Sequence, residues 1–298
     1  MSRDAIKHRL FGCILAVSVC SLAVGQKNAC PNCNALNKKQ PPFRIFGNAY
    51  YVGTHGLSSV LITSSAGHVL IDGDLPESAG LIAGNIQSLG FRIEDVKLIV
   101  NSHVHSDHAG GIAELQRRSG ARVVASEWSA EVLRKGGVRK GDPQYRTLAP
   151  IAEVKNVSTF RDGESLQVGD ITLTPHLTPG HTPGGTSWTW KSCEGKLCRD
   201  LVYADSLNPI SSPGFHFSSQ RDYPHALEDF DKSFVFLDSA PCDILITAHP
   251  ELSGLWDRLE QREKGANPDA MVEAGACRRL ADDFRARLKQ RLAEEGKP

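Results

Sequence analysis

Residues 96–111 read VKLIVNSHVHSDHAGG, an apolar run followed at once by three histidines and an aspartate. The run at 96–100 is almost continuously apolar, which is typical of a strand covered on both faces. Four metal-binding side chains then fall within six residues: His103, His105, Asp107 and His108. A protein core does not tolerate so many such groups without a ligand. A strand end and its loop can aim His103 and His105 to one side and Asp107 and His108 to another, so the spacing favours two adjacent metal ions.

A cluster of solvated surface histidines is the ordinary alternative for a polar loop. Against it, Gly110 and Gly111 open the next helix and let the backbone approach closely. This indicates that the fold holds the four side chains in defined positions. Two further histidines stand out. His181 lies in the stiff Pro/Gly-dense loop LTPGHTPGGT, and His249 follows the apolar strand DILITA. Each would be an ordinary histidine if taken alone, but beside the cluster we predict that both are ligands.

Short apolar strands alternate with amphipathic helices along the rest of the chain. From hydrophobic periodicity and turn residues we expect strands at 43–52, 59–63, 68–71, 96–100, 122–125, 165–168, 171–177, 186–190, 200–204 and 243–247. We expect helices at 76–89, 111–119, 129–135, 224–237 and 271–295. Strands and helices interleave without a low-complexity linker, which indicates one α/β domain from about residue 43, a two-sheet sandwich with helices outside.

Several motifs together resemble the metallo-β-lactamase superfamily. They are HVHSDH at 103–108, GHTPGG at 180–185, AHP at 248–250 and LIDG at 70–73. Within that superfamily, TSWTW at 186–190, YADSL at 203–207 and SGLW at 253–256 resemble the third subclass of class B β-lactamases. The resemblance implies a four-layer αβ/βα sandwich of two mixed β-sheets, with helices on the outer faces and the site at the open edge between the sheets.

The resemblance also implies which side chains hold metal. The expected ligands of a first zinc ion are His103, His105 and His181, and those of a second are Asp107, His108 and His249. Nitrogen and oxygen ligands of this kind suit Zn²⁺, while iron and manganese stay open from ligand type alone. We therefore expect two Zn²⁺ ions per chain.

The implied activity is hydrolysis of the β-lactam amide of penicillins, cephalosporins and carbapenems, which gives antibiotic resistance. A hydroxide held by the two metal ions would attack the lactam carbonyl, and Asp107 would be the catalytic side chain because its spare oxygen can orient the water or relay its proton. The chain contains neither a Ser-x-x-Lys nor a Gly-x-Ser-x-Gly motif, so a serine mechanism is disfavoured.

Three further residues are candidates near the metals. Asp72 resembles the carboxylate that fixes the tautomer of a ligand histidine, with a turn cap as its alternative role. Ser206 resembles a serine beside the second zinc, and Asn208 stands where relatives often carry a Ser or Thr that binds the substrate carboxylate. We do not expect His55 or His216, both in loops near the site, to be metal ligands.

Thioester and lactone hydrolases, similar to glyoxalase II and to lactonases, are the main alternative because one fold supports many functions. Such enzymes commonly bridge their metals with an extra aspartate, so Asp205 facing the metals would favour them and Ser206 facing the metals would favour a lactamase. Export, disulfides and the C-terminal tail favour the lactamase. A zinc-stabilised binding protein would need closed four-coordinate sites, whereas six ligands for two metals leave positions open.

Composition and the N-terminus suggest an exported protein that acts on a small molecule. The chain has 34 lysines plus arginines and 34 aspartates plus glutamates. Its formal net charge is therefore zero and does not attract nucleic acid or an anionic membrane. A cationic start, an apolar run at 10–24, and Ala23 and Gly25 before the cut have the layout of a cleavable signal. A retained anchor is disfavoured because the run is too short, and lipidation at Cys20 is disfavoured by the bulky Val19.

We therefore predict a signal peptide at 1–25, an N-terminal arm at 26–42 and a metallo-β-lactamase domain at 43–298. The protein should be periplasmic or secreted, monomeric, and free of membrane after cleavage. The cysteines that remain after cleavage are Cys30, Cys33, Cys193, Cys198, Cys242 and Cys277. An even number in an oxidising compartment indicates disulfides.

Sequence alone does not give the disulfide connectivity. Cys193 with Cys198 would staple a hairpin, and Cys242 with Cys277 would tie a buried strand to the last helix. For Cys30 and Cys33, the polar arm argues against a redox pair. These two cysteines either pair together or leave one thiol free.

Overall fold

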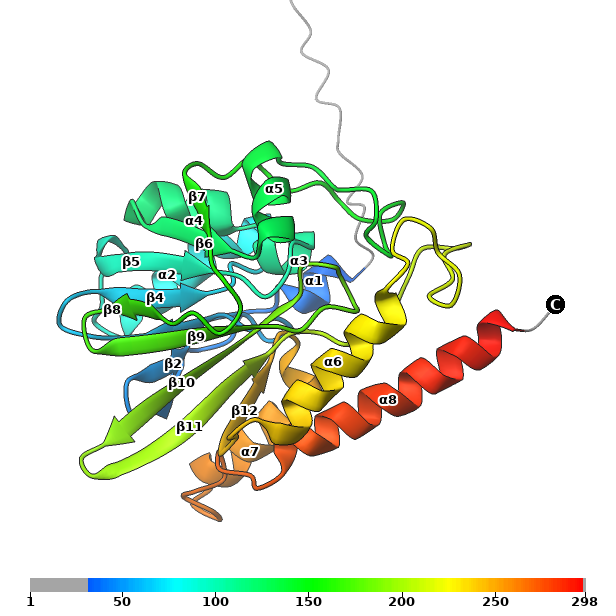
Figure 1. Ribbon diagram of the computed structural model, residues 1–298. Coiled ribbons are helices and arrows are strands. Elements are labelled where there is room, and N and C mark those ends of the chain that lie inside the picture. Colours follow the sequence, from blue (N-terminus) through cyan, green and yellow to red (C-terminus); the bar gives the residue numbers. More distant parts are fainter. Residues whose placement is uncertain (1–31, 297–298) are drawn as a thin grey trace, which may run out of the picture.

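Two β-sheets lie face to face, and helices cover their outer sides (Figure 1). This arrangement comes from a computed structural model that describes residues 32–296. The expected signal peptide, the first part of the arm and Cys30 lie outside the described residues. Within the described range, no helix is both long and apolar enough to span a membrane.

The first sheet has seven strands among the described residues, in the order of the chain. They are β1 (Phe43–Phe46), β2 (Ala49–Tyr51), β3 (Val60–Ile62), β4 (His68–Ile71), β5 (Val96–Val100), β6 (Arg122–Ala125) and β7 (Val157–Thr159). Strands β1 to β4 pair antiparallel, and β4 to β7 pair parallel through crossovers that contain helices. The helical segments between β4 and β7 are η1 (Pro76–Ser78), α2 (Ala79–Ser88), η2 (Ile93–Asp95), α3 (Ser106–Ala109), α4 (Ile112–Ser119) and α5 (Glu127–Lys135).

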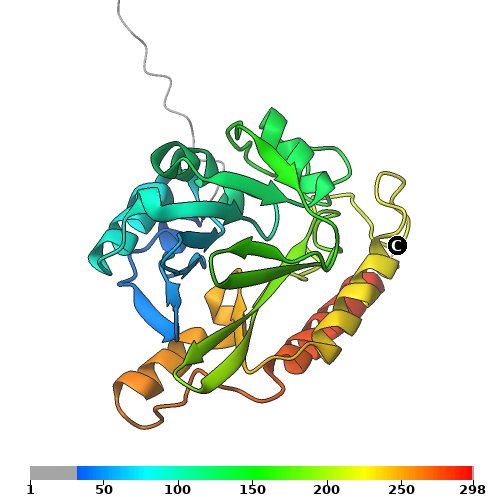
Figure 2. The ribbon, with the colours of Figure 1, turned by 60° about the vertical axis from the view of Figure 1, so that its left-hand side comes forward.

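The second sheet has the order β12, β11, β10, β9, β8 within residues 32–296. Its strands are β8 (Leu166–Val168), β9 (Ile171–Leu177), β10 (Thr186–Glu194), β11 (Leu197–Ala204) and β12 (Ile244–Thr247). Helices α6 (Ala226–Ser239) and α8 (Ala276–Glu295) run side by side along its outer face, as Figures 1 and 2 show. Two shorter elements, η3 (Pro250–Ser253) and α7 (Leu255–Glu263), follow β12.

Large side chains fill the space between the sheets. Tyr51, Trp188 and Tyr203 are fully buried there, and Trp190 joins them on the inner face of β10. Alternate residues of β10 point inward and outward, as the two-residue period of a strand requires. The indole of Trp188 donates a hydrogen bond of 3.1 Å to the carbonyl of Asn101, just after β5. This contact ties the second sheet to the loop that carries the histidine cluster.

Most of the expected elements are confirmed, with differences at glycines. Residues 43–52 form the hairpin of β1 and β2 rather than one strand, because Gly47 has a φ of 53° and turns the chain. The last helix begins at Ala276 rather than at 271, because Gly275 precedes it in the left-handed region with a φ of 74°. Strand β7 and helices α1 (Cys33–Leu36), α3 and α7 were not predicted.

Both suggested disulfides in the domain are confirmed. Cys193–Cys198 closes the β10–β11 hairpin, and Cys242–Cys277 joins the segment before β12 to the first turn of α8. Cys33 is also disulfide-bonded.

Candidate metal centre

The six expected ligands come together where strands of both sheets end. The segment after β5, with helix α3, supplies His103, His105, Asp107 and His108, while His181 lies between β9 and β10 and His249 follows β12. The buried strands fix the starting points of these segments, so side chains far apart in the sequence meet at one edge of the sandwich.

The first group consists of three buried histidines. His103, His105 and His181 offer ligand atoms that all lie within 4.8 Å of one another. Their ring centroids are 4.5 Å apart for His103 and His105, 5.0 Å for His103 and His181, and 4.9 Å for His105 and His181. This arrangement leaves room for one ion between the three rings.

The second group shares this edge. Asp107 Oδ2 lies 3.4 Å from His108 Nε2 and 3.6 Å from His249 Nε2, and the two histidine nitrogens are 3.2 Å apart. His103, Asp107 and His108 also have ligand atoms within 4.8 Å of one another. The two groups therefore lie next to each other and together form a metal-binding site.

Hydrogen bonds to the outer nitrogens of the first group set the direction of each ring. Asp205 Oδ1 lies 2.7 Å from His103 Nδ1, Asp142 Oδ2 lies 3.0 Å from His105 Nε2, and the Asn208 carbonyl lies 2.6 Å from His181 Nδ1. Such contacts fix the tautomer and orientation of histidines that bind metal. The opposite nitrogens, Nε2 of His103 and His181 and Nδ1 of His105, face inward. The Nε2 atom of His103 is buried without a hydrogen-bond partner.

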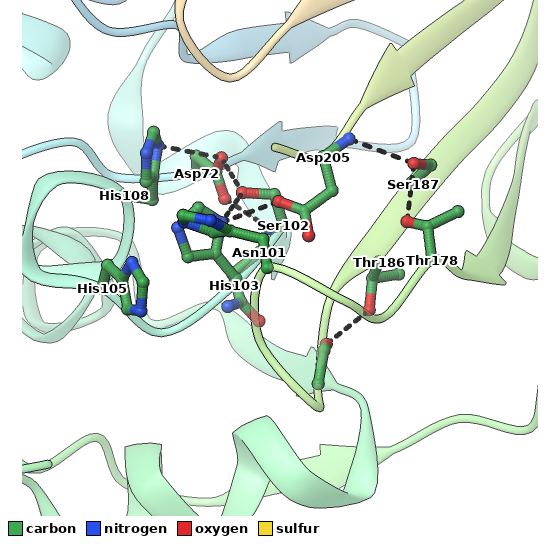
Figure 3. Close-up of polar contacts among 12 residues, drawn as sticks. Asp72, Asn101, Ser102, His103, His105, His108, Thr178, Thr186, Ser187 and Asp205 are labelled. Atoms are coloured by element: carbon green, nitrogen blue, oxygen red, sulfur yellow. Dashed lines mark hydrogen bonds and ion pairs between the residues drawn. The ribbon is translucent and has the colours of Figure 1, made fainter. Parts of the chain in front are cut away.

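Asp205 contacts a histidine of the first group. The residue is 1% exposed, and one carboxylate oxygen is engaged with the outer nitrogen of His103 (Figure 3). Ser206 is buried beside it. Asn208 uses its main-chain carbonyl on His181, and a substrate-binding role for its half-buried side chain stays a prediction.

Asp72 lies between the histidine loop and the second sheet. Its carboxylate accepts hydrogen bonds from the Ser102 amide (2.6 Å), the Ser102 hydroxyl (2.7 Å) and the Tyr203 hydroxyl (2.7 Å). His108 Nδ1 lies 3.8 Å from Asp72 Oδ2, which is longer than a hydrogen bond (Figure 3). Asp72 therefore holds the backbone of the histidine loop in place, and its role in orienting His108 stays a prediction. Its φ of 61° is rare for a residue other than glycine and is typical of functional sites.

Sequence reasoning missed two residues of the loop after α5. Asp142 holds His105, and Gln144 Nε2 lies 3.4 Å from both His105 Nδ1 and His181 Nε2. The amide of Gln144 therefore faces the inner atoms of two histidines. The only signal was the Gly-Asp-Pro turn at 141–143, which resembles the stiff loop around His181 but contains no metal-binding motif.

Two other histidines lie outside the two ligand groups. His55 stacks on Trp256, and His216 is exposed.

Electrostatics keep four of the six expected ligands in the states that bind metal. Burial, together with neighbouring histidines, lowers the pKa of His103 well below its usual value, and that of His181 to about 4. Burial also lowers the pKa of His108 to about 3. Burial opposes ionisation of Asp107, but His108 and His249 outweigh it and lower its pKa to about 2. At neutral pH these three rings thus have free lone pairs beside a carboxylate.

We expect the Asp205→Ala substitution to weaken zinc binding by about 10-fold to 100-fold, because His103 loses the partner that orients its ring. Asp205→Asn is the matched variant, since its amide oxygen still accepts a hydrogen bond from Nδ1, and it should lose less. Competition of each purified variant with a zinc chelator measures the affinity. Equal affinity of Asp205→Ala and the unsubstituted protein would show that His103 needs no such support.

Comparisons with known proteins agree with this geometry. The family model of the metallo-β-lactamase superfamily matches residues 52–249. Among solved structures, the Rm3 metallo-β-lactamase has 56% sequence identity and a TM-score of 0.88, over 90% of this chain and 99% of that one. MEM-A1, a subclass B3 metallo-β-lactamase from a soil metagenome library, has 48% identity and a TM-score of 0.85, over 87% and 98%.

A curated relative with another activity also matches. The hydroxyacylglutathione hydrolase of Rhodopseudomonas palustris is 28% identical over 131 residues, which is 44% of this chain and 42% of that enzyme. The chain thus spans less than half the length of this relative. The likeness to Rm3, by contrast, extends over nearly the whole of that chain.

The chain belongs to the metallo-β-lactamase superfamily. It is a hydrolase of this type, and its fold and sequence resemble those of subclass B3 members. The expected sandwich of two mixed sheets with outer helices is confirmed.

Proposed function

We propose that this protein is a zinc-dependent β-lactamase that opens the amide bond of penicillins, cephalosporins and carbapenems and so gives antibiotic resistance. The observation that carries the proposal is the two adjacent ligand groups, with Asp205 engaged on His103. The 56% identity to Rm3 supports the same substrate class. We further propose export to the periplasm, action as a monomer, and neither nucleic acid nor membrane as a partner.

The side chains at the site fit two zinc ions. Five imidazoles and one carboxylate are the nitrogen and oxygen donors that Zn²⁺ prefers. The buried Nε2 of His103 has no hydrogen-bond partner, which is costly unless a ligand takes its lone pair. His103, His105 and His181 would hold the first ion, and Asp107, His108 and His249 the second. Three protein ligands for each ion leave positions free for water and substrate.

Zinc bound there would supply a Lewis acid for the lactam carbonyl and a water-derived nucleophile at neutral pH. Asp107 is the catalytic side chain in this proposal: one oxygen faces His108 and His249, and the other would orient the attacking water or take its proton. Asp205, Asp142 and the Asn208 carbonyl keep the rings aligned. Ser206 and Asn208 are the proposed contacts for the substrate.

Thioester or lactone hydrolysis is the alternative, and the relationship to hydroxyacylglutathione hydrolase supports it. Against it, one carboxylate oxygen of Asp205, Oδ1, is engaged with the outer nitrogen of His103, whereas a bridging role would require the carboxylate between the ions. The likeness to that relative is also lower and shorter than the likeness to Rm3.

A substrate panel tests the proposal. With zinc present, we expect kcat/KM on the order of 10⁴ M⁻¹s⁻¹ or more for a chromogenic cephalosporin and for a carbapenem, the range of ordinary enzymes. A glutathione thioester and an acyl homoserine lactone should be poor substrates under the same conditions. Rapid cleavage of the thioester or the lactone, with no turnover of several β-lactam classes, would refute the β-lactamase assignment while leaving the family membership intact.

A further inference from the structure

We propose that the C-terminal end of helix α8 positions two histidines of the metal site through hydrogen bonds that cross two loops. The proposal rests on the metal-binding part of the proposed function and concerns residues that no metal motif includes. Residues 142–147 are called the first loop and residues 208–218 the second loop. Figure 1 shows the segment before α6 between the end of α8 and the segment that follows α5.

Each loop holds the outer nitrogen of one histidine. Asp142, at the start of the first loop, lies 3.0 Å from His105 Nε2, and the Asn208 carbonyl, at the start of the second, lies 2.6 Å from His181 Nδ1. His105 and His181 belong to the same group of three. A shift of either loop would therefore rotate a ring whose opposite nitrogen faces inward.

Ser212 joins the two loops. The residue is 3% exposed, and its amide donates a hydrogen bond of 2.9 Å to the Pro143 carbonyl. Its hydroxyl accepts a hydrogen bond of 3.2 Å from the Arg146 amide and lies 3.1 Å from the Thr147 hydroxyl. One buried serine thus contacts three residues of the first loop, so the two loops are held as a unit.

Arg291, near the end of α8, holds the second loop from the outside. Its Nη2 donates hydrogen bonds to the Ser211 hydroxyl (2.8 Å) and to the Phe215 carbonyl (2.7 Å). These two acceptors flank the Pro213-Gly214 turn on either side of Ser212. The guanidinium therefore spans the turn that carries the joining serine.

Glu295 completes the attachment one helical turn later. Its carboxylate accepts hydrogen bonds from the Phe217 amide (2.9 Å) and the Ser218 amide (3.1 Å), and Arg291 Nε donates to it at 3.0 Å. The Glu295 side chain is only 3% exposed. Charged hydrogen bonds in such a dry position are stronger than bonds between neutral groups. The last turn of α8 and the second loop thus form one hydrogen-bonded unit.

Helix α8 is a firm base for this unit. The Cys242–Cys277 disulfide attaches its first turn to the segment before β12. Leu280, Phe284 and Leu288 on its inner face belong to the same buried hydrophobic cluster as residues of α6. At 1.5 Å per residue, its 20 residues span about 30 Å. The helix therefore connects the disulfide end of the molecule with the loops at the metal site.

Zinc affinity of the full-length mature protein tests the proposal. We expect Arg291→Ala and Glu295→Gln to bind zinc about 10-fold more weakly, as loss of groups that support metal ligands does. The visible spectrum of the cobalt-substituted protein should change as well. Arg291→Lys keeps the charge but loses the forked donor, so its zinc affinity should fall between those of the unsubstituted protein and Arg291→Ala. The matched controls are Lys289→Ala and Glu294→Gln, exposed changes on the same helix, and they should leave both readouts unchanged.

A double variant shows whether the contacts act in series. If Arg291 acts through Ser212, Arg291→Ala combined with Ser212→Ala should lose no more zinc affinity than the weaker-binding single variant. Fully additive losses would overturn the proposal. So would variants with a lower unfolding temperature but the original zinc affinity and cobalt spectrum, because that is the signature of a purely structural role. None of these readouts uses a β-lactam, so failure of the substrate assignment is distinguishable from failure of this proposal.

Discussion

Asp107→Ala is expected to lower kcat/KM for a chromogenic cephalosporin by about 10²-fold to 10⁴-fold, the usual contribution of a positioned proton-transfer group. The substitution removes the only carboxylate of the second ligand group, where Asp107 Oδ2 lies 3.4 Å from His108 Nε2 and 3.6 Å from His249 Nε2. It therefore removes both a ligand atom and the oxygen that orients the nucleophile. Occupancy of the second metal should fall together with the rate, and metal content measured beside the steady-state kinetics checks both.

Asp231→Ala is the matched control, because Asp231 is an exposed aspartate on α6. This variant should retain the rate and the metal content of the unsubstituted protein. Near-normal turnover of Asp107→Ala would contradict the role assigned to this carboxylate. A fall in rate with both metals still bound would assign Asp107 to proton transfer alone and would contradict its role as a ligand.

Removal of metal is expected to reduce hydrolysis to the background rate. The inner nitrogens of the histidines and the Asp107 carboxylate lie close together, and in this account nothing else at the site activates water. The unfolding temperature should fall as well, because a ligand that binds only the folded state at 1,000 times its Kd stabilises by about 4 kcal/mol. Incubation with a chelator, followed by addition of zinc, should abolish and then restore activity.

A chelator that has been saturated with zinc beforehand is the control for this experiment, and it should not inhibit. Full activity after dialysis against the free chelator would contradict a metal-dependent mechanism. Loss of activity that zinc does not restore would point to unfolding, which circular dichroism of the treated protein detects.

The sequence predicted the parts of the site that depend on local pattern. His103, His105, Asp107 and His108 follow a buried apolar strand within a few residues, so their common position did not depend on knowing the rest of the fold. His249 also follows a strand that is apolar enough to be recognised. The pairs Cys193–Cys198 and Cys242–Cys277 were foreseeable because each joins segments with clear strand or helix character.

The groups that support the ligands were not predictable in the same way. Asp142 and Gln144 lie in an irregular loop that has no hydrophobic period, and their distances to His105 depend on how that loop packs. Asp205 was noticed, but whether it faced the metals or a histidine depended on the direction of one side chain after β11. The contacts of Arg291 and Glu295 join segments about 80 residues apart. Local sequence carries little information about such pairs.

Elemental analysis of the purified, folded protein tests the central claim most directly. The claim is that six side chains from separate parts of the chain hold a pair of zinc ions. We expect about two zinc ions per chain after removal of loosely bound metal. Folded protein that contains no transition metal, and that takes up none when zinc is supplied, would contradict it.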